Sequence, residues 1–78
     1  MPADIVKIVR DYISEKEGWA VDVYTITSKN VSDKEGNLIV NVIHKDDQKG
    51  VYHFGGGKSV ELHIDIVNKV VVRELHFQ

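Results

Sequence analysis

The first seventeen residues place hydrophobic side chains at the spacing of a helix. They recur at intervals of three and four residues, and the positions between them are mostly charged. The hydrophobic positions are Ile5, Ile8, Val9, Tyr12 and Ile13. Pro2 is tolerated in a first turn, and Gly18 can adopt the left-handed conformation that ends many helices. The pattern predicts a helix from about Ala3 to Glu17.

After this helix the pattern becomes typical of β-strands. β-branched and aromatic residues dominate Trp19–Thr27, which predicts a strand of about ten residues. Polar residues at Asn30–Asn37 predict the turn of a hairpin. A second strand is expected at Leu38–Ile43 and a short third one at Val51–Phe54. The glycines that follow this third segment interrupt the strand pattern.

The clearest alternation of apolar and polar residues lies in Val60–Ile66. It predicts a strand with one face in the core and the other in solvent. A tight turn at Asn68-Lys69 is expected to return the chain as a last strand, Val70–Phe77. We therefore expect an α+β fold in a single domain, residues 1–78, with one N-terminal helix packed across a four- or five-stranded antiparallel meander sheet.

A two-residue turn at Asn68-Lys69 also predicts the register of the last hairpin, with Val67 opposite Val70. On the outer face, this register predicts two charge-complementary pairs, His63 with Glu74 and Glu61 with His76. The same register places Ile66 and Arg73 on the face of the sheet that packs against the helix. The residues of this hairpin expected on the outer face are Glu61, His63, Asp65, Val70, Val72, Glu74 and His76. For the first strand, the pattern leaves open whether Tyr24 and Ile26, or Trp19, Val21 and Val23, lie on that face.

Charge and composition narrow the class of protein. Twelve acidic and ten basic side chains give a formal net charge of -2, which disfavours binding to nucleic acid. No apolar run approaches the ~18 residues of a membrane-spanning helix, and no signal peptide is recognised, so we expect a cytoplasmic protein that does not bind membranes. The absence of cysteine excludes disulfides, thiolate zinc sites and cysteine enzymes.

The segment Gly57-Lys58-Ser59 ends like a phosphate-binding loop. That motif requires a glycine where Tyr52 stands and a helix after the serine, whereas this sequence predicts a strand. The three glycines Gly55, Gly56 and Gly57 instead favour a turn or a bulge, because glycine tolerates left-handed dihedrals. An anion or partner contact made by their amides together with Lys58 is the alternative.

Histidines are frequent in this short chain, but none of them forms a recognised zinc motif. They are His44, His53, His63 and His76. Solvated cross-strand pairs are the favoured interpretation of His63 and His76, and a surface metal site is the alternative. No serine lies on a nucleophile elbow, and the acids are expected on an exposed face. We therefore expect no catalytic residues, no metal, no cofactor and no enzymatic activity.

A helix followed by a meander, with Ile64-Asp65 and Val71 in the terminal hairpin, resembles PepSY-like and cystatin-like domains. It is similar also to small bacterial immunity proteins, which neutralise a toxin by binding it. The resemblance implies a non-catalytic binding or inhibitory module that acts through loops and sheet surfaces. Asn68-Lys69 stands where a Thr-Gly turn is usual. The cystatin Gln-Val-Val-Ala-Gly hairpin is absent, so protease inhibition is not implied.

One helix covers only one face of a sheet, which leaves the other face for a partner. We expect a protein-binding or inhibitory module with a protein partner, and a homodimer formed through the open sheet face or an edge. The candidate binding residues are Gly55, Gly56, Gly57, Lys58, His63, Val70, Val72 and Glu74. The alternative function is binding of a small ligand, anion or metal by the Gly55–Lys58 loop or by the outer-face histidines.

Overall fold

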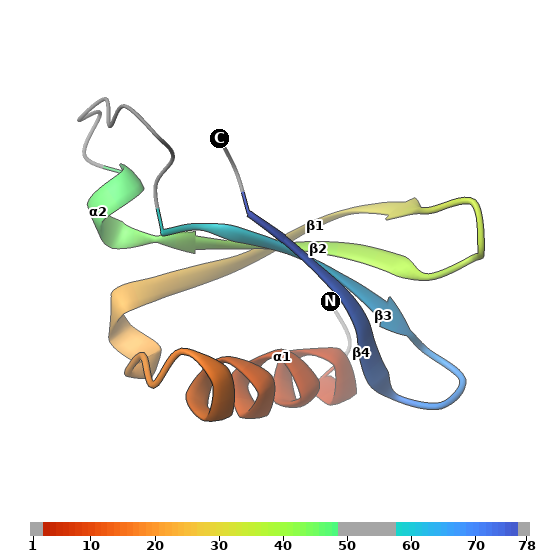
Figure 1. Ribbon diagram of the computed structural model, residues 1–78, viewed down its shortest axis with the longest axis horizontal. Coiled ribbons are helices and arrows are strands. Elements are labelled where there is room, and N and C mark those ends of the chain that lie inside the picture. The colour runs from red at the N-terminus through yellow and green to blue at the C-terminus, as the bar shows by residue number, and fades with distance from the viewer. Residues whose placement is uncertain (1–2, 49–57, 77–78) are drawn as a thin grey trace.

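The structure, a computed structural model, describes residues 3–48 and 58–76 (Figure 1). Four strands form one antiparallel sheet in the order β1-β2-β3-β4, and this meander with an N-terminal helix confirms the α+β fold. The elements are α1 (Ala3–Lys16), a 3₁₀ turn η1 (Val21–Val23), β1 (Tyr24–Ser32), β2 (Leu38–His44), α2 (Lys45–Gln48), β3 (Val60–Asp65) and β4 (Val70–His76). The short strand predicted at Val51–Phe54 lies outside the described residues.

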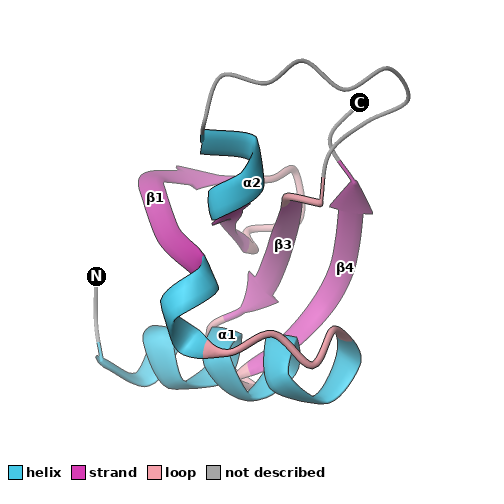
Figure 2. Cartoon of the chain, turned by 90° about the vertical axis from the view of Figure 1, so that its left-hand side faces the viewer, coloured by secondary structure: helices cyan, strands magenta, loops and turns pink. Residues whose placement is uncertain are grey.

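The hydrophobic core lies between α1 and one face of the sheet. Ile5, Val9 and Ile13 form the buried stripe of α1, as their spacing predicts. From the sheet, the core receives Tyr24, Val40, Val42, Val60, Leu62 and Ile64. Both views show α1 on one side of the sheet only (Figure 1, Figure 2). The helix ends where Gly18 adopts a φ of +71° and donates its amide to the carbonyl of Ile13 at 3.0 Å.

The first strand begins five residues later than predicted. Trp19 does not enter the sheet; its ring packs against Tyr24 and, edge-on, against His44. Pairing starts at Tyr24 because its partner His44 is the last residue of β2. Tyr24 is buried in the core, and Ile26 packs against the core, so the alternation places Thr25 and Thr27 on the outer face. Neither set of residues considered for that face from the sequence therefore occupies it.

The predicted phase of β3 is confirmed at Val60, Leu62 and Ile64, which are fully buried. Ile66 is an exception, because it is 52% exposed and lies in the loop after the strand. The predicted two-residue turn at Asn68-Lys69 is wrong. The connection between β3 and β4 contains four residues, 66–69, and the last of them has a φ of 59°.

Asp65 accounts for the longer connection. Its carboxylate accepts hydrogen bonds from the backbone amides of Val67 and Asn68, each at 3.0 Å, and from the Asn68 side chain at 2.8 Å. The Lys69 amide donates to the Asp65 carbonyl at 2.7 Å. These bonds hold a turn wider than the two-residue type. They also hold the pKa of the Asp65 carboxyl below its usual range.

The predicted register of the last hairpin is wrong, because the connection is two residues longer than expected and a bulge further along β4 adds one more residue. Leu62 lies opposite Glu74 and His63 opposite Arg73, and Val72 is an extra residue in a bulge. A shift of one residue exchanges the two faces of a strand. Glu74 therefore lies on the helix side, Arg73 lies on the outer side, and the predicted pairs of His63 with Glu74 and of Glu61 with His76 do not form.

Candidate functional site

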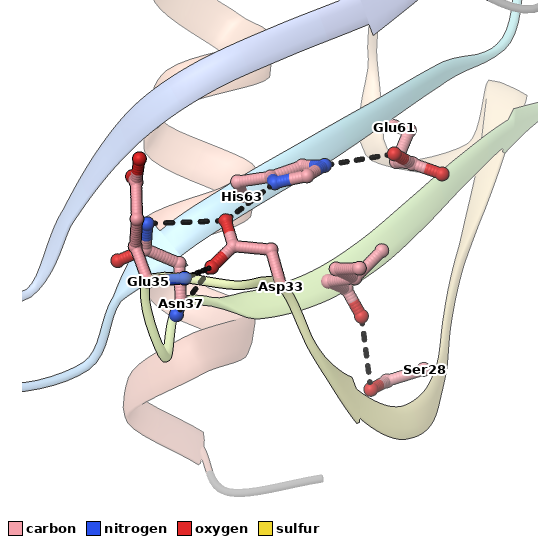
Figure 3. Close-up of polar contacts among 7 residues, drawn as sticks. Ser28, Asp33, Glu35, Asn37, Glu61 and His63 are labelled. Atoms are coloured by element: carbon pink, nitrogen blue, oxygen red, sulfur yellow. Dashed lines mark hydrogen bonds and ion pairs between the residues drawn. The ribbon is translucent and has the colours of Figure 1, made fainter.

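The outer face of the sheet carries a partly buried network of two acids and a histidine, Asp33, Glu61 and His63, which we call the acid–histidine network (Figure 3). Nδ1 of His63 lies 2.7 Å from Oδ2 of Asp33, and Nε2 lies 2.8 Å from Oε2 of Glu61. Although it lies on the face away from α1, His63 is only 4% exposed. The network joins the β1–β2 turn to the central strand β3.

Asp33 is held in place by the turn that contains it. Its Oδ1 accepts the backbone amides of Glu35 at 2.8 Å and Asn37 at 2.9 Å, and its Oδ2 accepts the Asn37 side chain at 3.1 Å. Gly36 has a φ of +84°, which favours glycine. The sequence predicts this turn. It does not predict that the Asp33 carboxylate reaches His63, thirty residues further along the chain.

The two acids stabilise the charged form of His63. The hydrogen bond to Glu61, followed by that to Asp33, raises the pKa of His63 against the opposing effect of burial. The contact with His63 in turn holds the pKa of Asp33 far below its usual range. An imidazolium can donate one hydrogen bond from each ring nitrogen. With both nitrogens engaged by carboxylates, neither is available as a general base, so the network is suited to cross-linking and not to proton transfer.

The other described histidines also have partners. The backbone amide of Asp46 donates to Nδ1 of His44 at 3.1 Å, and His76 pairs with Glu74 at 2.9 Å. His63 and His76 lie on opposite faces of the sheet, since they pair with Arg73 and Val60 on strands that alternate. Within residues 3–48 and 58–76, no group of three or more acids and histidines is arranged to hold a metal ion. His53 lies outside this range.

Exposed aliphatic side chains are concentrated on β4 and the loop that precedes it. We call this surface the β4 edge; its residues are Ile66, Val67, Val70, Val72 and Leu75, which are 44–84% exposed. Among the strands of residues 3–48 and 58–76, β4 has a neighbour only on the side of β3. The β4 edge therefore combines an open strand with apolar side chains.

A groove runs between the β4 edge and α1. It has a volume of about 240 Å³ and is lined by Ile8, Asp11, Tyr12, Glu15, Lys69, Val70 and Val71. The Tyr12 hydroxyl donates to Oε1 of Glu74 at 2.5 Å and so connects the helix to β4. Burial and this hydrogen bond raise the pKa of Tyr12 to about 12. The phenol therefore remains protonated at neutral pH.

The predicted binding residues are distributed over several places. Gly55, Gly56 and Gly57 lie outside the described residues, and Lys58 contacts Asp46 at 2.9 Å. His63 is enclosed in the acid–histidine network. The three remaining residues, Val70, Val72 and Glu74, are all on β4.

Sequence reasoning missed the groove because it treated α1 only as a cover for the sheet. The signal was present: Ile8, Tyr12 and Glu15 recur at helical spacing on a stripe beside the core stripe.

Within the described residues no helix is long and apolar enough to cross a membrane. Comparison with known proteins gave no match to a protein family, a curated protein or a solved structure.

Proposed function

We propose that this protein is a non-enzymatic protein-binding module whose binding surface is the β4 edge. One observation carries the proposal. Of the seven large hydrophobic residues that are exposed in the described part of the chain, five lie between Ile66 and Leu75. Scattered surface hydrophobes are ordinary, whereas their concentration on one element is typical of an interaction surface.

The type of element supports the same proposal. An edge strand presents unpaired backbone amides and carbonyls, to which an extended segment of another protein can add as a further strand. Each edge strand contains one register shift, and the two edges differ in polarity: β1 exposes Thr25 and Thr27, whereas β4 exposes Val70 and Val72. A polar edge disfavours the pairing of an apolar partner strand. The two edges are therefore unequal, and β4 is the better acceptor.

The acid–histidine network supports the non-enzymatic part of the proposal. Its imidazole has both nitrogens within 2.8 Å of a carboxylate oxygen. The groove beside β4, at about 240 Å³, is below the ~300–1,000 Å³ typical of small-molecule sites. Lys58 is in contact with Asp46, and His63 with Asp33 and Glu61, so no described geometry favours the anion or metal alternative.

Dimer formation stays a proposal, and the β4 edge is the better route to it. The outer sheet face carries Thr25, Thr27, Asn41, Glu61 and Arg73 among its apolar residues. Such a face is a poor apolar interface. A second copy of the chain would instead meet the exposed valines of β4.

Selection from a random library of ten-residue peptides displayed on phage tests the proposed function. Selected peptides should bind the wild-type protein and lose at least tenfold in affinity to a Val72→Lys variant, because the substitution places a charge on the edge. Val31→Lys is the matched control, since Val31 is 49% exposed on β1 and Val72 is 51% exposed on β4. A failure to select any binder, or equal loss of affinity in both variants, overturns the proposal.

A further inference from the structure

We infer that the groove between α1 and β4 selects a partner strand that carries a lysine or arginine side chain flanked by apolar ones. This inference rests on the proposed function and deepens it, because it assigns a chemistry to the partner that adds to the β4 edge. The occupant is an extended segment of another protein.

The position of the groove suits a strand added to β4. Both views show the start of β4 beside α1 (Figure 1, Figure 2), and the lining residues come from these two elements and from Lys69 of the loop before β4. Side chains of an added strand alternate between the two faces of the sheet. Every second side chain of the partner therefore points toward the face that α1 covers. At about 240 Å³, the groove has the size for such side chains and not for a large ligand.

The residues that line the groove favour a partner side chain with an apolar stem and a positively charged head. Ile8, Tyr12 and Val70 give the groove an apolar lining. Asp11 and Glu15 contribute two carboxylates from α1 to the same lining. Lysine and arginine place their methylene stems along apolar surface and their charged heads near carboxylates or water. A partner aspartate or glutamate would instead meet like charge.

The basic residues nearby do not cancel this preference. Lys69 lines the groove, but its ammonium lies 3.4 Å from the carboxylate of Asp4 in the first turn of α1. Lys7 contacts Asp11 at 2.7 Å. With these two contacts made, Glu15 is the acid of the lining whose charge is not balanced by a described ion pair. Glu15 is therefore the residue expected to discriminate between basic and acidic partners.

Two labelled peptides and a charge reversal test the inference by fluorescence anisotropy. Both peptides alternate threonine and valine over nine residues; one has a central lysine and the other a central glutamate. We expect the wild-type protein to bind the lysine peptide about fivefold more tightly, the upper range for one exposed ion pair. Glu15→Lys should reverse the preference. Glu35→Lys makes the same charge change at an exposed turn position away from the groove and should leave the preference unchanged.

The outcomes separate this inference from the proposed function. If both peptides bind equally, lose affinity in Val72→Lys and are unaffected by Glu15→Lys, the β4 edge binds strands but the groove does not select charge, and the inference is overturned. If neither peptide binds, both proposals are overturned. If sedimentation shows a wild-type dimer that neither peptide dissociates, the occupant is a second copy and the inference is again wrong. Circular dichroism of each variant confirms that it folds.

Discussion

Strands β3 and β4 are paired along their length and rich in the same aliphatic residues, yet they differ in nearly every other respect. β3 lies between β2 and β4, and its Val60, Leu62 and Ile64 have no exposed surface. In the part of the chain that the structure describes, β4 has a neighbouring strand on one side only, and its Val70 and Val72 are about half exposed. The hydrophobic residues of β3 therefore stabilise the fold. Those of β4, apart from Val71, are exposed, and under the proposed function they bind a partner.

The largest effect should come from truncating a core residue of β3. Leu62→Ala removes a fully buried side chain and leaves a cavity, so it should lower the free energy of unfolding by about 2 to 5 kcal/mol. Val72→Ala, at the exposed position of β4, should change it by less than about 0.5 kcal/mol. Urea denaturation of the two variants measures the difference. Equal urea midpoints would show that the contrast between the strands is wrong.

Removal of the buried histidine should have the next largest effect. His63→Ala leaves the carboxylates of Asp33 and Glu61 without their shared partner, and should destabilise the fold by about 2 to 4 kcal/mol. His76→Ala is the control on β4, where the histidine side chain is 62% exposed, and its effect should be much smaller. Urea denaturation near pH 6 gives both values. A harmless His63→Ala would mean that the acid–histidine network is not a cross-link.

The same network should make stability depend on pH. The folded-state pKa of His63 is raised above 6.5, so its contribution is full below pH 6.5 and is lost as the pH rises through the raised value. The pKa of Asp33 is lowered from 3.8, so its contribution is full above pH 3.8 and is lost as the pH falls through the lowered value. The network should therefore stabilise most between pH 3.8 and pH 6.5. Denaturation of wild type and His63→Ala at several pH values measures this dependence. In the variant the contribution of His63 should disappear, and that of Asp33 should shrink to the part supplied by the hydrogen bonds from Asn37 and Glu35.

The sequence predicts the parts of the molecule that depend on local periodicity. Helix α1 and the buried phase of β3 follow from spacing alone, because each presents one apolar face. The β3–β4 register fails because Asp65 closes a four-residue connection through its side chain, and because the bulge at Val72 then shifts the pairing by one residue and exchanges the faces of Arg73 and Glu74.

The candidate site was predicted only in part, because some of its residues are placed by contacts with distant segments of the chain. Val70 and Val72 were expected on an exposed surface, and they lie on one. Glu74 was expected outside and instead accepts a hydrogen bond from Tyr12 on the helix side. His63 was expected in solvent and is buried, because Asp33 approaches it from a turn thirty residues away. Contacts between distant segments leave no periodic signal in the sequence.

The smallest predicted effect is self-association of the wild-type protein at micromolar concentration. The exposed β4 edge favours contact between copies, and a net charge of -2 opposes it only weakly. Val72→Lys should shift the mass toward the monomer, and Val31→Lys on the opposite edge should not. Sedimentation equilibrium measures all three proteins. A wild type that remains at 8.8 kDa up to about 100 μM would contradict self-association.

Mapping the bound peptide on the protein tests most directly whether the β4 edge binds the partner. Backbone amide shifts of ¹⁵N-labelled protein can be followed while a library-selected peptide is added. We expect the largest changes in Val70–His76 and along Ile8–Glu15 of α1, with the amides of β1 nearly unchanged. Changes concentrated on β1 or on the β1–β2 turn, with β4 unaffected, would contradict the assignment of the β4 edge as the binding surface.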